Sequence, residues 1–139
     1  MDELMDRVLY ELDKGYHCSQ VMMRLSMDLR GIDDPFTIRA LGALGGGMFA
    51  QRACGTLTGG ACLLASYFSR EEGEPEPAAY QNLVRKLAIW FEETYGSIEC
   101  RNLVGSDLGR ASTLCPRMMA ETFAKCLELL EEEGVDPYE

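Results

Sequence analysis

The stretch that decides the fold is QRACGTLTGGACLLA, residues 51–65. Cys54 stands immediately before Gly55, and three adjacent glycines lie just upstream, in LGALGGGMF. Beyond Cys54 the glycines thin out into an apolar run that carries no charged side chain as far as Ser69. We therefore predict a glycine-rich loop that leads into a buried central helix running from about Cys54 to Ser69.

Apolar residues recur at helical spacing on both sides of this segment. The helix around Cys18 illustrates the pattern, because Val21, Met22, Leu25 and Leu29 fall on the same face and Gly31 ends it. No apolar run of period two is present, so no strand is expected. The sequence predicts an all-α, single-domain bundle of about five to six helices spanning 1–139, with the outer helices at 2–14, 18–30, 33–44, 77–95 and 116–133.

Length and composition describe an ordinary globular domain. The chain has 139 residues, of which 47% are hydrophobic and 26% charged. Its opening, MDELMDRVLYELDK, is typical of an amphipathic helix rather than a secretory signal, and the uncharged run 53–69 is too short and polar for a membrane span. The net charge of −10 and the lack of a basic stripe argue against nucleic-acid binding. We expect a cytoplasmic protein.

Six cysteines are many for such a chain. In a reducing compartment they are more often metal ligands, catalytic thiols or core residues than structural disulfides. No Cys-x-x-Cys pair occurs, which argues against a zinc ribbon, a local thioredoxin-type site and a c-type haem site. Any shared site must therefore be assembled by the fold from distant segments. Cys62 and Cys126 fall within predicted helices and are expected to be inert buried thiols.

Cys54 is the most informative cysteine. At a helix N-terminus, free backbone N–H groups and the helix dipole stabilise a thiolate, and such placement can lower a thiol pKa to about 3.5–7.5. The positive charge of Arg52 would add to this effect. Gly55 and Gly59, four residues apart, leave a bare helix stripe where a second element or a cofactor could come close. The alternative is that Cys54 is a small apolar residue in a tight helix crossing.

Three further cysteines lie at predicted element boundaries. Cys18 begins its helix, Cys100 precedes a segment broken by glycines, and Cys115 follows that segment directly before Pro116, at the expected start of the last helix. His17, the lone histidine, is expected to be a surface or hydrogen-bonded residue rather than a catalytic base.

In these boundary blocks the chain resembles the C_GCAxxG_C_C family, which is described as redox-active. The similar blocks are GYHCSQVM, ACGTLTGGACLL, CRNLVGSD and LCPRMMAETFAKCLELL, and they supply Cys18, Cys54 with Gly55 and Gly59, Cys100, and Cys115. The resemblance covers roughly residues 4–133. Thr56 replaces the alanine of the family motif, and His17 stands where asparagine is expected. The resemblance implies a single helical domain with a redox or metal role.

Three functions remain open from the sequence. The first is thiol–disulfide exchange, with Cys54 as the attacking thiol and Cys18, Cys100 or Cys115 as the resolving one. The second is an iron–sulfur cluster, or another soft metal, bound by those same four cysteines. The third is a non-catalytic interaction protein whose eight methionines and glycine stripe suit a partner or homodimer surface. We slightly favour thiol redox chemistry, with a redox partner that the sequence does not identify.

Overall fold

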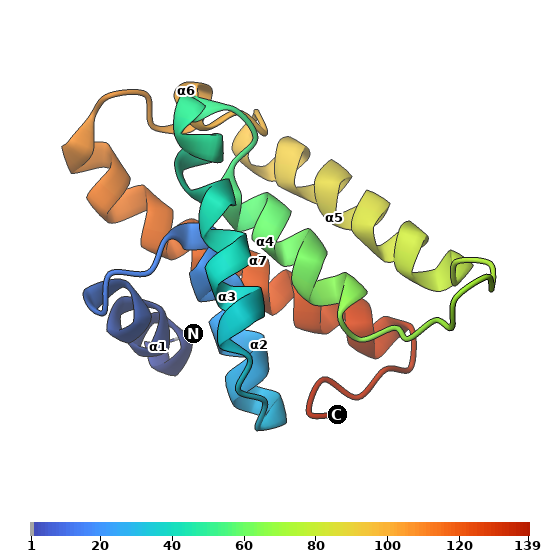
Figure 1. Cartoon of the computed structure of the whole chain (residues 1–139). Coiled ribbons are helices and arrows are strands. Elements are labelled where there is room, and N and C mark those ends of the chain that lie inside the picture. Colours follow the sequence, from blue (N-terminus) through green and yellow to red (C-terminus); the bar gives the residue numbers. More distant parts are fainter. Residues whose placement is uncertain (1) are drawn as a thin grey trace.

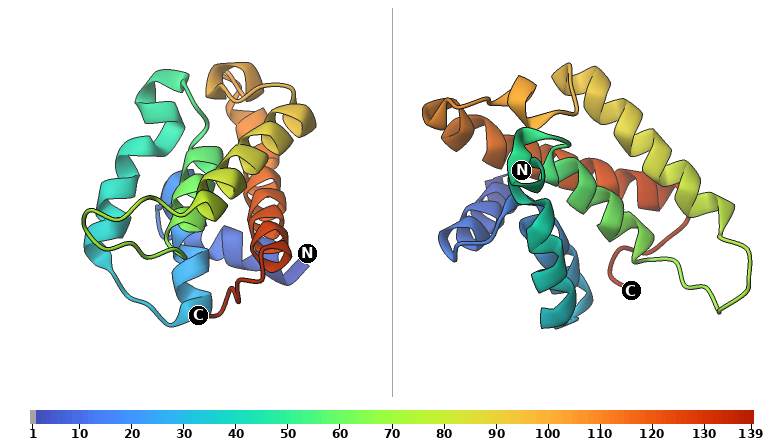
Figure 2. Two further views of the ribbon diagram at one scale, coloured as in Figure 1. Left: turned by 90° about the vertical axis from the view of Figure 1, so that its right-hand side faces the viewer. Right: turned by 45° about the horizontal axis from the view of Figure 1, so that its top comes forward.

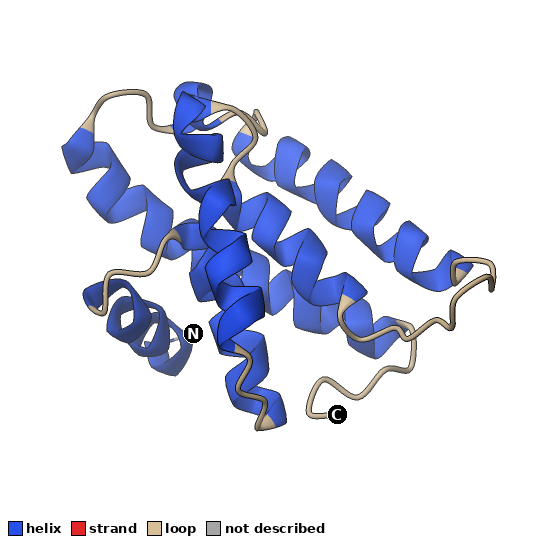
Figure 3. Cartoon of the chain, in the orientation of Figure 1, coloured by secondary structure: helices blue, strands red, loops and turns tan. Residues whose placement is uncertain are grey.

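Helices form the fold of residues 2–139, the part of the chain that our computed structural model describes (Figures 1 and 3). Within this range no strand forms, and one isolated bridge joins Ala53 to Glu99. The all-α expectation is therefore confirmed. The helices are α1 (Asp2–Asp13), α2 (Cys18–Arg30), α3 (Pro35–Leu41), α4 (Gly55–Ala65), α5 (Ala78–Tyr95), α6 (Cys100–Leu103) and α7 (Leu108–Glu132), with the short turns η1 (Gly42–Leu44) and η2 (Gly47–Gln51) before α4.

The central helix is α4, which packs against α2, α5 and α7 (Figure 2). Gly59 explains the close approach of α2, since a Cβ there would lie 2.7 Å from the carbonyl oxygen of Ser19. The bare stripe predicted from Gly55 and Gly59 therefore faces α2, because a Cβ at Gly55 would also meet Cys18 and Ser19 of that helix. A side chain at Gly59 would force α2 and α4 apart.

The core is built where these helices meet. Its fully buried side chains come from α1, α2, α4, α5 and α7, which places one hydrophobic core at the centre of the bundle. The most deeply buried large apolar residues are Val8, Val21, Met22, Leu63, Leu64, Leu83, Leu87, Phe91, Met118, Leu129 and Leu130. None of the helices in residues 2–139 combines the length and the apolar character needed to cross a membrane.

The last helix starts well before its expected beginning at Pro116. Asp107 caps α7 by accepting a hydrogen bond from the backbone N–H of Arg110 at 2.9 Å, so the helix begins at Leu108. Pro116 lies inside the helix, where its ring removes one backbone donor. The prediction that Cys115 opens this helix was therefore wrong. Cys115 lies in the third turn of a helix that began upstream.

The glycine-rich loop before α4 contains a left-handed turn. Gly46, Gly47, Met48 and Phe49 are successive residues with positive φ, between 55° and 64°. Gly47 is required there because a Cβ would lie 2.4 Å from the backbone nitrogen of Arg52. The turn then delivers the chain through Arg52 to Cys54 and the start of α4. We call residues 46–51 the left-handed turn.

Candidate redox site

Four cysteines from four separate segments line one cavity of about 200 Å³. We call this cavity the four-cysteine chamber. It is lined by residues of α2, α4, α6 and α7, whose arrangement Figure 1 shows, and of the segments next to α4, α6 and η2. Its lining residues are Cys18, Gly46, Cys54, Gly55, Thr56, Cys100, Leu103, Val104, Ala111, Cys115 and Met118.

Backbone hydrogen bonds hold the segments of Cys54 and Cys100 together. The N–H of Cys54 donates to the carbonyl of Ile98, and the N–H of Cys100 donates to the carbonyl of Arg52, each at 2.7 Å. These two bonds form a short antiparallel clip around the Ala53–Glu99 bridge. The clip fixes the N-terminal residue of α6 beside the residue that caps α4.

Cys18 reaches the chamber because Gly55 leaves room for its sulfur. A Cβ at position 55 would lie 2.5 Å from Cys18 Sγ and 2.9 Å from the carbonyl oxygen of Leu44. Any larger residue would displace either the thiol or the backbone of η1. The absence of a side chain at Gly55 therefore allows Cys18 to lie close to Cys54.

The chamber walls favour neutral thiols. Burial, and then the nearby Cys18, raises the pKa of Cys54 to about 11, although the N–H groups of Thr56 and Leu57 oppose the shift. Burial and the three other chamber cysteines raise the pKa of Cys115 to about 11. The pKa of Cys100 is raised by burial and by Cys18. Bringing these sulfurs together in an apolar space is thus unfavourable for thiolates unless a cation accompanies them.

The pKa of Cys54 is therefore shifted in the direction opposite to the one expected for an activated thiol. The predicted position is correct, because Cys54 is the capping residue directly before α4. However, its side chain is only 6% exposed, and the loss of solvation outweighs the stabilisation by the helix end. Arg52 does not compensate for this loss, because its half-exposed side chain pairs with Glu99 at 3.7 Å.

The other highlighted residues lie outside the chamber. Cys126 is fully buried in the core, as expected, and burial raises its pKa. Cys62 is half-buried and lines a separate apolar groove of about 580 Å³ between α3 and α4. His17 is exposed at the start of α2, and its ring meets the ring of Phe49 edge-on at 5.1 Å. Gly59 belongs to the helix crossing.

The apolar wall of the chamber was not predicted from the sequence. On α7, Ala111, Cys115 and Met118 share one helix face at spacings of four and three residues. This spacing could have been recognised in the sequence. It was missed because the last helix was expected to begin only at Pro116, which left Ala111 and Cys115 outside it. Gly46, Leu103 and Val104 come from irregular or very short segments, and their contribution depends on tertiary contacts.

The four cysteines share a cavity without forming a compact site for a single metal ion in the described residues. Among residues 2–139, no three Cys, His, Asp or Glu side chains gather closely enough to hold one metal ion. A mononuclear thiolate site requires every sulfur at about 2.3 Å from one point. The four cysteines instead line a shared cavity of about 200 Å³.

Fold and site together define a small helical protein with a chamber lined by four cysteines. Residues 16–129 match the family described as "Putative redox-active protein (C_GCAxxG_C_C)", and the chain belongs to this family. No curated protein and no solved structure matches the chain in the corresponding comparisons.

Proposed function

We propose that this protein is a redox protein that binds an iron–sulfur cluster through Cys18, Cys54, Cys100 and Cys115. The observation that carries the proposal is the convergence of these four thiols, from four segments, on one apolar cavity of about 200 Å³. Four thiolates are the usual ligand set of such clusters, which supply one-electron transfer when bound. Membership of a redox-active family supports the same class of function.

The surrounding residues suit this role. Leu103, Val104 and Met118 give the chamber an apolar wall, and burial and hydrogen bonding around the ligands set the reduction potential of such a site. The raised pKa values of Cys54 and Cys115 mean that binding must release protons from both thiols. The N–H groups of Thr56 and Leu57 at the start of α4 then stabilise the Cys54 thiolate.

A second candidate is a disulfide between Cys18 and Cys54. It is favoured by the position of Cys18 Sγ against Gly55, the residue next to Cys54. In such an exchange the two protein thiols would reduce an external disulfide, giving one protein disulfide and two released thiols. We rank it second because the raised pKa of Cys54 leaves little thiolate at neutral pH to start the attack.

Anaerobic purification with iron, acid-labile sulfide and thiol counts on one sample tests both candidates. We expect visible absorption with stoichiometric iron and sulfide, lost in Cys54→Ser and Cys115→Ser. Cys62→Ser is the matched control, because it changes a cysteine on the same helix as Gly55 but outside the chamber. That variant should keep its iron and sulfide.

Two other outcomes would contradict cluster binding. A metal-free protein that reversibly loses two thiols on mild oxidation, with the loss abolished by Cys18→Ser, would establish the disulfide instead. If iron reconstitution fails and all six thiols persist after oxidation, neither redox candidate holds and a non-catalytic interaction protein remains.

A further inference from the structure

The left-handed turn at residues 46–51 is the most unusual backbone in the protein. Among residues 2–139, the only residues other than glycine with positive φ are Met48, Phe49 and Gln51, at 56° to 60°. All three lie in this one turn. Left-handed backbone brings the Cβ atom of an L-residue too close to the following carbonyl oxygen, so each of the three is strained.

Apart from the edge-on contact of the Phe49 ring with the His17 ring at 5.1 Å, the strained residues gain little from packing. Met48 and Phe49 are 54% and 66% exposed, and Ala50 and Gln51 are exposed as well. The turn is held by the bond from the Arg52 N–H to the Gly47 carbonyl at 3.0 Å and by the bond from Gln51 Nε2 to the Gly105 carbonyl at 2.8 Å. The second of these bonds is exposed to solvent. The closed turn is therefore a weakly held piece of the surface.

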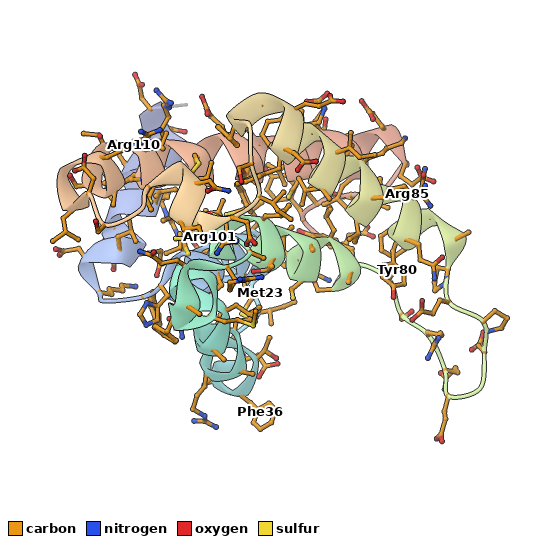
Figure 4. All side chains as sticks on the ribbon, turned by 90° about the horizontal axis from the view of Figure 1, so that it is seen from above. Met23, Phe36, Tyr80, Arg85, Arg101 and Arg110 are labelled. Carbon is orange, nitrogen blue, oxygen red and sulfur yellow. The ribbon has the colours of Figure 1, made fainter. Side chains whose placement is uncertain are left out.

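This turn is also part of the chamber wall, because Gly46 lines the cavity. The other walls are held more firmly. Helices α2 and α4 are anchored in the core, α6 is tied to the Arg52–Cys54 segment by two backbone bonds of 2.7 Å, and the first turns of α7, which carry Ala111 and Cys115, are held by the cap at Asp107. Seen from above, Arg101 lies on α6 beside the η2 turn, whereas Tyr80 lies at the distant start of α5 (Figure 4). Because residues 48–51 are all exposed, opening the turn would disturb few buried contacts.

We propose that the left-handed turn at residues 46–51 is the gate of the four-cysteine chamber, and that its backbone strain sets how often the chamber opens. Gly45 and Gly46 provide the hinge on one side, and the clip at Arg52 limits the motion on the other. Strain raises the free energy of the closed turn and so populates the open one. Molecules reach Cys54 through this opening. The proposal concerns access and does not depend on which group the chamber binds.

The test is the alkylation rate of Cys54 by iodoacetamide, measured by peptide mass spectrometry on the reduced, metal-free full chain. Glycine tolerates positive φ, so Met48→Gly and Phe49→Gly should stabilise the closed turn and slow the reaction about fivefold each. A simple steric cover predicts the reverse, because both variants remove bulk. Phe49→Ala should not slow the reaction, since alanine keeps the strained backbone while losing the ring.

Ala50→Gly is the matched control, because Ala50 lies in the same turn without positive φ. There glycine only adds freedom and should accelerate alkylation. Cys62 provides an internal reference outside the chamber. Unchanged or faster Cys54 alkylation in both Met48→Gly and Phe49→Gly would overturn the proposal. Equally slowed alkylation of Cys62 would also overturn it, because the variants would then act through the overall stability of the protein rather than through the turn. An iron-free protein would refute cluster binding without affecting this test.

Discussion

At the scale of single residues, the chamber depends on one missing side chain. Gly55 leaves the space that Cys18 Sγ occupies, and the nearest obstacle besides this sulfur is the backbone carbonyl of Leu44. Backbone atoms cannot rotate away as a flexible side chain can. The position therefore tolerates substitution less well than Gly60, where a Cβ would meet the end of the Leu87 side chain at 3.1 Å.

We expect Gly55→Ala to destabilise the protein by about 1–3 kcal/mol through overpacking. The same change should lower the iron and sulfide bound per chain, because the Cys18 thiol is displaced. Urea unfolding and metal analysis measure the two effects. Gly60→Ala is the matched control and should keep full iron content. Normal iron in Gly55→Ala would show that the chamber does not need Cys18 at its present position.

The raised pKa of Cys54 also predicts how stability depends on pH. Because burial favours the neutral thiol, the folded state binds this proton more tightly than the unfolded state does. Its contribution is fully present below the ordinary thiol pKa and is lost as the pH rises towards about 11.

The metal-free, reduced protein should therefore lose free energy of unfolding between about pH 8.5 and 11, with roughly 2 kcal/mol of the loss due to Cys54. Urea unfolding at pH 8 and pH 10.5 measures the loss. In Cys54→Ala the fall should be shallower by that amount. Equal slopes for the variant and the parent would show that Cys54 titrates normally in the folded protein.

At the scale of elements, the chamber wall relies on the early start of α7. The turns from Leu108 to Cys115 extend beyond the bundle core and carry Ala111 and Cys115 into the chamber. Pro116 separates these turns from the rest of the helix by removing a backbone hydrogen bond. The cap at Asp107 is therefore important to the ordering of this segment.

Asp107→Ala should cost about 1 kcal/mol by removing the cap. We expect the loss to be local, because the helix beyond Pro116 is anchored in the core. Amide hydrogen exchange should accelerate in residues 108–115 and stay unchanged in 117–132. Asp107→Asn, which retains a capping oxygen, should restore protection. Uniform acceleration along α7 would contradict a locally capped segment.

At the scale of the whole molecule, a buried charge attaches α1 to the bundle. Glu11 is 1% exposed, and its carboxylate accepts hydrogen bonds from Arg24 Nε and Nη2 at 3.1 and 3.4 Å. Lys14 adds a longer ion pair at 3.7 Å. A second pair, between Arg7 and Asp28, joins the same two helices at the surface.

Arg24→Ala should destabilise the protein by about 3–5 kcal/mol, because it leaves the Glu11 carboxylate buried without its main partner. The double variant Glu11→Met/Arg24→Met removes both charges and should recover most of that loss. Thermal or urea unfolding measures both variants. Arg7→Ala, which breaks the exposed pair, should cost no more than about 1 kcal/mol. Similar losses from Arg24→Ala and Arg7→Ala would contradict the role given to burial.

Much of this architecture could be read from the sequence, because helical periodicity is a local property. The starts of α2 and α5 follow from the break at Gly15 and from Pro77, and both agree with the structure. The position of Cys54 before α4 was likewise predicted from the glycines around it. The family blocks marked the same four cysteines, and the family is confirmed.

Tertiary structure alone decided what these residues do together. The convergence of four cysteines depends on the clip between Cys54 and Cys100 and on the space above Gly55, which are contacts between distant segments. The pKa of Cys54 rises because neighbouring helices remove water from it, against the effect of its own helix. The left-handed turn is likewise held from outside, by Arg52 and Gly105. Local sequence determines which elements form, whereas solvation and strain depend on what those elements meet.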